Sequence, residues 1–153
     1  MSNLVFSNIH PAQITDKNLN QVLLDLIEQS SKIIVASGYI SNDAIVEIHR
    51  LVADDLDRIK ELSIFIGMHY IAGFTKNQYC SCVRLNQLIL EKGVGAVYVS
   101  PNMSFHGKMY SFVSNEGVHT GLIGSANLSS FIKSIERTYE TMFLAKNDET
   151  AKD

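Results

Sequence analysis

The sequence of 153 residues contains no tryptophan, only two cysteines and two prolines, and no excess of basic residues. The cysteines, Cys80 and Cys82, are too few for a zinc site and too close together for an ordinary disulfide across one strand or helix face. They are typical of free thiols in a reducing cytosol. No signal peptide and no run of 18 apolar residues occurs, so we expect a cytoplasmic protein without membrane contact.

The composition predicts one ordinary globular domain over residues 1–153. Apolar residues make up 46% of the chain and charged residues 19%, with no bias towards disorder. A chain of this length buries roughly 68–70% of its unfolded surface in one core. The net charge is -3, whereas a domain that binds nucleic acid by itself is usually basic. Any contact with DNA must therefore be local, or be supplied by another domain.

Apolar patterns along the chain predict an α/β fold, a mixed sheet flanked by helices on both faces. Residues 68–74, with two glycines nearby, are expected to form a loop over the carboxyl end of the sheet, where such folds bind ligands. His69 in that loop is either a substrate contact or a turn histidine satisfied by backbone groups. The expected strands are residues 4–6, 33–38, 62–67, 94–100, 105–110, 119–123 and 138–145, and the expected helices are residues 15–30, 41–59 and 75–92.

The motif with the clearest chemistry is His106-Gly-Lys108, which opens a predicted hairpin. Residues two apart on a strand leave the same face, so a nucleophile or general acid stands beside a fixed positive charge. That pair suits a phosphate group. Gly117 supplies the positive φ of the hairpin turn, and the returning strand would bring Ser125 and Asn127 close to His106 and Lys108.

His106-x-Lys108 followed by Gly124-Ser125-x-Asn127 resembles the HxK…GSxN signature of the phospholipase D superfamily. The sequence around the motif, HGKMY…GSANLS, is most similar to the nuclease branch of this superfamily. Within it, the small α/β layout and the loop at residues 67–69 resemble the catalytic domain of NgoFVII/BfiI-type restriction endonucleases. The similarity extends over residues 32–145. Two departures are that Val113 stands where the family often has an aspartate, and that the Lys-to-Gly-Ser gap is longer.

The resemblance implies cleavage of a phosphodiester without a metal or a cofactor. His106 would attack phosphorus to give a phosphohistidine, and a second histidine would protonate the leaving oxygen. Lys108 and Asn127 would bind the phosphate oxygens, and Ser125 would form hydrogen bonds within the same group of residues. An attacking histidine needs a carboxylate on its other nitrogen. In this family that glutamate follows the asparagine. Glu140, at the head of the last expected strand, is the preferred candidate, and Glu136 is its competitor.

The superfamily mechanism uses two copies of the motif, and this chain has one. We therefore expect a C2 homodimer in which both His106 and both Lys108 side chains converge on one site. The restriction-enzyme resemblance implies DNA as the substrate and a separate DNA-recognition domain after the catalytic one. Two alternatives remain open: a lipid phosphodiesterase, and a catalytically silent module for dimerisation or DNA binding.

Overall fold

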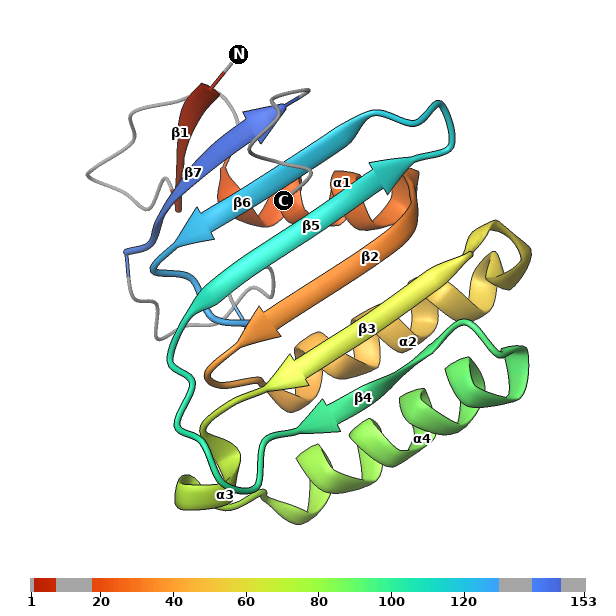
Figure 1. The fold of residues 1–153 in the computed structure, drawn as a ribbon, viewed down its shortest axis with the longest axis vertical. Coiled ribbons are helices and arrows are strands. Elements are labelled where there is room, and N and C mark those ends of the chain that lie inside the picture. The colour runs from red at the N-terminus through yellow and green to blue at the C-terminus, as the bar shows by residue number, and fades with distance from the viewer. Residues whose placement is uncertain (1, 8–17, 130–138, 147–153) are drawn as a thin grey trace.

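Seven strands form one mixed β-sheet in the computed structural model, which describes residues 2–7, 18–129 and 139–146. The strand order is β1-β7-β6-β5-β2-β3-β4, as Figure 1 shows. Strands β2, β3 and β4 are parallel to one another, and β5, β6, β7 and β1 pair antiparallel. The predicted mixed sheet is confirmed. The strands are β1 Ser2–Phe6, β2 Ser30–Ser37, β3 Glu61–Ile66, β4 Gly95–Val99, β5 Lys108–Ser114, β6 His119–Gly124 and β7 Thr141–Lys146.

In the described residues, three long helices and two short ones lie between the strands. The helices are α1 Leu19–Gln29, α2 Asn42–Asp54, α3 His69–Ala72 and α4 Lys76–Lys92, with a 3₁₀ turn at Leu56–Arg58. The predicted third helix is confirmed as α4: Thr75 and Gln78 form a capping box at its start, and Gly93 ends it with φ 73°. Among the described residues, no helix combines the length and apolar character needed to cross a membrane.

The other two helices differ from the prediction at their ends. Helix α1 is capped by Asn18, whose side chain accepts a hydrogen bond from Gln21 N at 2.9 Å. Thr15 and Asp16, the expected caps, lie outside the described residues. Helix α2 ends at Asp54, before Ile59, because the chain leaves helical geometry at Asp55 with φ -144° and ψ 62°. The expected loop after β3 contains the short helix α3.

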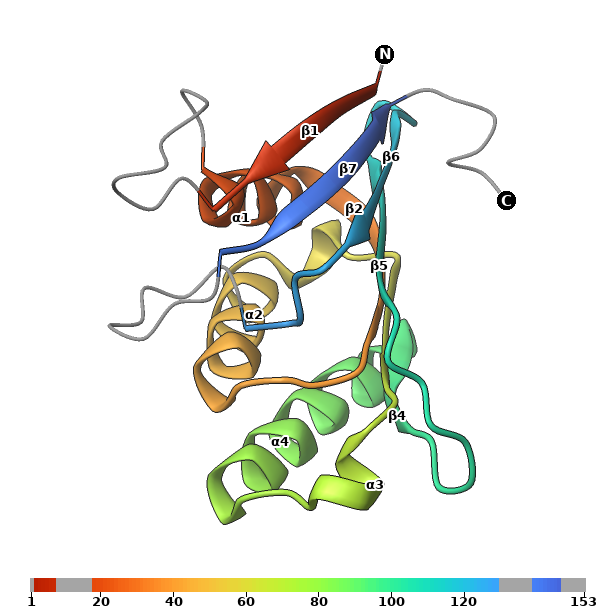
Figure 2. The ribbon, with the colours of Figure 1, turned by 90° about the vertical axis from the view of Figure 1, so that its left-hand side faces the viewer.

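The described helices lie on one face of the sheet, although we expected helices on both (Figure 2). Side chains alternate along each strand, so one set of strand residues packs against α1, α2 and α4 to form the core. The other set points away from them. It includes a row that runs in register across the sheet, with exposed apolar side chains at Leu4, Phe143, Ile123, Met109, Phe65 and Tyr98.

The apolar run in β2 shows why this asymmetry was missed. Ile33, Ile34 and Val35, in the strand expected over residues 33–38, are consecutive β-branched residues, a pattern typical of a strand buried on both faces. Ile33 and Val35 are indeed buried at 1% exposure, but Ile34 between them is 36% exposed. The pattern reports apolar character on both faces, and it does not report whether a helix covers each face.

We expect substitutions on the two faces of β3 to differ sharply in their effect on stability. Ile64→Ala should lower the free energy of unfolding by about 2–5 kcal/mol, because Ile64 is fully buried against the helices. Phe65→Ala should cost under about 1 kcal/mol, since Phe65 is 42% exposed. Urea denaturation of both variants measures the difference. Equal losses would show that the second face is covered in solution.

Candidate active site

The pairing of β2 with β5 places the predicted motif at the centre of the sheet. Ser37, the last residue of β2, lies opposite Lys108, the first residue of β5. Lys108 is only 7% exposed and shares the helix-covered face with Tyr110, whereas Met109 between them is 51% exposed. His106, two residues before Lys108, therefore enters the site from the same side of the chain.

His106 and Lys108 are in direct contact, as their spacing predicts. Lys108 Nζ lies 2.9 Å from Nδ1 and 3.3 Å from Nε2 of the imidazole, and it donates to the His106 carbonyl oxygen at 2.6 Å. Desolvation lowers the pKa of Lys108, and the negative charge of Glu140 opposes that shift in part. An ammonium group and an imidazole thus meet at one point, as binding of and attack on a phosphate require.

The Gly-Ser-Ala-Asn segment is folded against the start of β7 and the first half of β5. Ser125 N donates to Thr141 O at 3.1 Å, and the Tyr110 hydroxyl donates to Ala126 O at 2.8 Å. Burial raises the pKa of Tyr110, which keeps its hydroxyl protonated as a donor. A Cβ on Gly124 would lie 2.2 Å from Thr141 O, so only glycine fits at this position.

Asn127 reaches back to the end of β2. Its Oδ1 accepts a hydrogen bond from Tyr39 N at 3.2 Å, and its amide NH2 group donates to no other residue that the structure describes. Tyr39 also contacts His106, since the two ring centroids are 5.7 Å apart. Asn127 and His106 are therefore held against the same short segment, and the structure brings Asn127, His106 and Lys108 into one neighbourhood as predicted.

Ser125 and Glu140 form a pair of their own. The Ser125 hydroxyl donates to the Glu140 carboxylate, and Thr141 N donates to Ser125 Oγ at 3.0 Å. In the described part of the chain, no hydrogen bond joins Glu140 to His106, so its role in orienting the histidine stays a prediction. Its charge does reach Lys108. The competitor Glu136 lies outside the described residues.

Two residues that the motif did not include also support the site. Ser37 Oγ accepts from Leu128 N at 2.9 Å and donates to Tyr39 O at 2.6 Å, which ties the end of β2 to the segment after Asn127. Tyr110 supports that segment through Ala126. In the sequence, Ser37 could have been recognised as a small polar residue at the end of an apolar strand. Tyr110 could have been recognised by its position two residues after Lys108, which places both side chains on one face of the strand.

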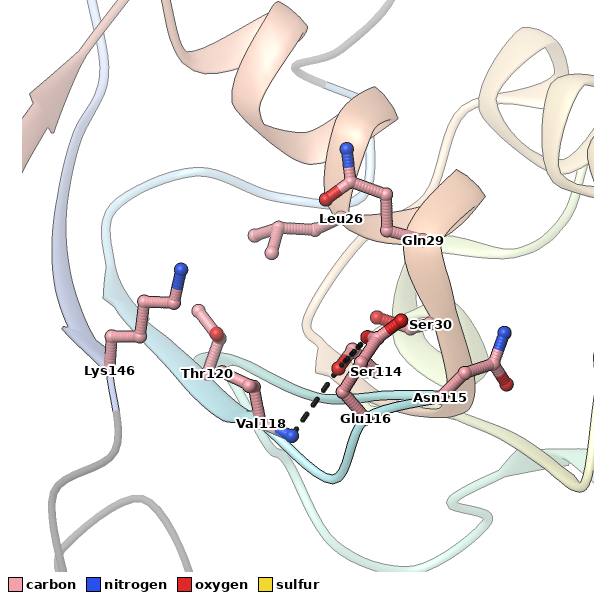
Figure 3. A pocket seen from close by; sticks show the side chains of 9 residues that line it. All are labelled: Leu26, Gln29, Ser30, Ser114, Asn115, Glu116, Val118, Thr120 and Lys146. Carbon is pink, nitrogen blue, oxygen red and sulfur yellow. Dashed lines mark hydrogen bonds between the residues drawn. The ribbon is translucent and has the colours of Figure 1, made fainter.

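A separate cavity of about 380 Å³ lies at the opposite end of β5 (Figure 3). It contains none of the predicted site residues. Its wall includes the hairpin turn, in which the Ser114 hydroxyl donates to Glu116 at 2.7 Å and Val118 N donates to Ser114 Oγ at 3.3 Å. Strand β5 starts at Lys108 and ends at Ser114, so the length of a strand separates the cavity from His106.

We expect Lys108→Met to raise the free energy of unfolding at pH 7 while it weakens the site. Burial lowers the folded-state pKa of Lys108, so the unfolded chain binds more protons between the folded and unfolded pKa values, and wild-type stability rises with pH across that window. Methionine removes the desolvation cost. Its advantage should therefore shrink as the pH rises through the folded pKa of Lys108.

Urea denaturation between pH 7 and pH 10 tests this expectation, with Lys32→Met as the control. The Lys32 side chain is 51% exposed and lies 4.0 Å from Glu61, so its removal should change stability by less than about 1 kcal/mol. A lower stability of Lys108→Met at pH 7 would show that the contacts with His106 outweigh desolvation.

Solved structures with the same fold cover nearly all of this chain. Polyphosphate kinase from Porphyromonas gingivalis aligns with a TM-score of 0.62 and 14% identity over 96% of this chain and 23% of its own. Phosphatidylserine synthase from Haemophilus influenzae aligns with a TM-score of 0.60 and 17% identity, over 98% of this chain and 35% of its own. A mutant of yeast tyrosyl-DNA phosphodiesterase aligns with a TM-score of 0.53 and 13% identity, over 94% of this chain and 32% of its own. The chain thus spans about a third or less of each of these proteins.

These identities are low, so the similarity to these structures shows a shared fold and no more. No curated protein matches the sequence. The family described as the NgoFVII restriction endonuclease N-terminal PLD domain matches residues 17–153, a range that includes every predicted site residue. From its sequence and its fold, the chain belongs to this family of restriction endonuclease PLD domains.

Proposed function

We propose that this chain is a metal-independent DNA phosphodiesterase, the nuclease domain of a type II restriction enzyme. Family membership and the fold support phosphodiesterase chemistry. The observation that carries the proposal is the contact of the Lys108 ammonium with both ring nitrogens of His106, at 2.9 and 3.3 Å. The donor group of Asn127 lies against the same segment. A nucleophile, a cation and an amide donor are what a phosphodiester anion needs.

In the proposed reaction a nitrogen of His106 attacks phosphorus. A P–N bond forms, the P–O bond to the leaving nucleoside breaks, and a second histidine gives that oxygen a proton. Water then attacks the phosphohistidine, passes its proton to the second histidine and releases His106. Lys108 and Asn127 stabilise the charge on the non-bridging oxygens in both steps. The Ser125–Glu140 pair lies behind Lys108, where its negative charge favours the protonated lysine.

The second histidine is the reason to propose a homodimer. Among the described residues, His69 has both ring nitrogens occupied, by Ile40 N at 3.2 Å and Gly73 O at 2.8 Å. His119 begins β6, beyond the hairpin turn at the end of the sheet remote from the site. His49 lies within helix α2, away from the motif. A second His106 from another subunit would fill the role, and base recognition would belong to a further domain.

Hydrolysis in excess EDTA tests the proposal directly. Wild-type protein should cleave DNA and bis(p-nitrophenyl) phosphate with the chelator present, and His106→Ala should lose at least about 10³-fold in kcat because it lacks the nucleophile. His49→Ala is the matched control and should keep wild-type activity. Turnover that His106→Ala retains would contradict the mechanism.

The same preparations separate the alternative functions. Vesicles of phosphatidylcholine are the substrate for the lipid alternative, and turnover of lipid with no cleavage of DNA would favour it. A silent module would bind DNA equally well in wild type and His106→Ala, with neither protein active on any substrate.

Mixing of subunits tests the shared site. If each dimer needs both His106 side chains, refolding equal amounts of wild type and His106→Ala together should leave about one quarter of the wild-type activity, because only that share of dimers carries two histidines. Independent sites in each subunit would leave about one half. Separately folded proteins, mixed just before the assay, provide the control.

A further inference from the structure

The segment Ser37–Ile40 between β2 and α2 is held more tightly than a connection requires. Tyr39 N donates to Asn127 Oδ1 at 3.2 Å, and Tyr39 O accepts from Ser37 Oγ at 2.6 Å. Ile40 N donates to His69 Nε2 at 3.2 Å, and Ile40 O accepts from Gln78 at 2.9 Å. The backbone on both sides of the Tyr39 side chain is thereby fixed.

The ring of Tyr39 lies between two imidazoles. Its centroid is 5.7 Å from that of His106 at an interplanar angle of 79°, and 5.7 Å from that of His69 at 76°. Both contacts are edge-to-face, the favoured geometry for such rings. A Cβ on the preceding Gly38 would lie 3.2 Å from both Cα and Cδ2 of His106. The segment is therefore packed directly against the proposed nucleophile.

His69 is a fixed support for this arrangement. Its Nε2 accepts from a backbone N–H, so Nδ1 carries the proton and donates to Gly73 O at 2.8 Å. The ring is 5% exposed and is stacked on Phe74, with centroids 4.5 Å apart and an interplanar angle of 15°. Both nitrogens are used by the backbone. Of the two earlier interpretations of His69, the geometry therefore favours the histidine satisfied by backbone groups.

We propose that Tyr39 is a positioning residue that holds the His106 ring for attack on phosphorus, with His69 as the support of Tyr39. The inference rests on the proposed function. Within the described residues, no carboxylate hydrogen-bonds to the His106 ring, and the ring contacts are Lys108 and Tyr39. Lys108 contacts both ring nitrogens, and the edge-to-face contact with the Tyr39 ring is the one that limits rotation of the imidazole.

A positioning role separates kcat from KM. Tyr39→Leu removes the aromatic ring that contacts His106 but leaves the backbone N–H that donates to Asn127. The proposed phosphate-binding groups, Lys108 and Asn127, therefore stay in place. We expect kcat to fall on the order of 10–100-fold, with KM changed less than about threefold, because misplacement of a reacting group acts on the chemical step. Tyr39→Phe keeps the ring and should retain activity within about threefold. Tyr79→Leu, an exposed tyrosine on α4, is the matched control and should match wild type.

The role of His69 in supporting Tyr39 is tested by a second pair of variants. His69→Leu removes both hydrogen bonds and should lower kcat as Tyr39→Leu does, whereas His69→Gln can accept from Ile40 N and donate to Gly73 O, and should recover most of the loss. Because His69→Leu removes a buried support, thermal denaturation of each variant accompanies the kinetics. The Tyr39 variants stand independently if His69→Leu does not fold.

Nuclear magnetic resonance of protein without substrate distinguishes this proposal from the proposed function. With labelled histidine and tyrosine, wild type should show a nuclear Overhauser effect between the Tyr39 and His106 rings, and Tyr39→Leu should broaden or shift the His106 ring signals. This readout needs no activity. Unchanged His106 signals in Tyr39→Leu would overturn the proposal. A loss of kcat in Tyr39→Phe equal to that in Tyr39→Leu would also overturn it, because the hydroxyl would then carry the effect.

Discussion

The antiparallel pairing of β2 with β5 is the constraint on which the site depends. It joins the parallel half of the sheet to the antiparallel half, and its register sets Ser37 opposite Lys108. A shift of this register by one residue would turn Lys108 and Tyr110 towards the face of the sheet that no described helix covers, and Met109 into the core. The burial of Tyr110 and Phe112 opposes that shift. The hydrophobic core therefore fixes which face of the sheet Lys108 occupies.

The parts of this arrangement that depend on local pattern could be predicted from the sequence. The two-residue spacing predicted the contact of His106 with Lys108, although β5 begins only at Lys108 and not at residue 105 as expected. Gly117 predicted the hairpin turn between β5 and β6. Periodicity and capping residues gave helix α4 in full. Each of these features is decided within a few residues of the chain, where propensity and tertiary packing agree.

The parts that depend on distant partners could not be predicted. Which face of the sheet the helices cover is decided by how the connections pack, and β2 is apolar on both sides. The hydrogen bonds that hold the backbone around Tyr39 join residues 37–40, 69 and 127–128, which no spacing rule connects. Glu140 was chosen from the family pattern, whereas its hydrogen bond with Ser125 joins residues 15 positions apart in the chain and was not predicted.

Lys108 explains how a chain with net charge -3 can be suited to a phosphate. Lys108 is only 7% exposed, and its ammonium group contacts the imidazole and the carbonyl oxygen of His106. Desolvation lowers the pKa of Lys108, and the negative charge of Glu140 opposes that shift without cancelling it. A partly desolvated cation attracts an anion more strongly than an exposed one, because water screens it less. If the proposed function holds, local burial of Lys108, rather than the overall charge, makes the site attractive to a phosphate.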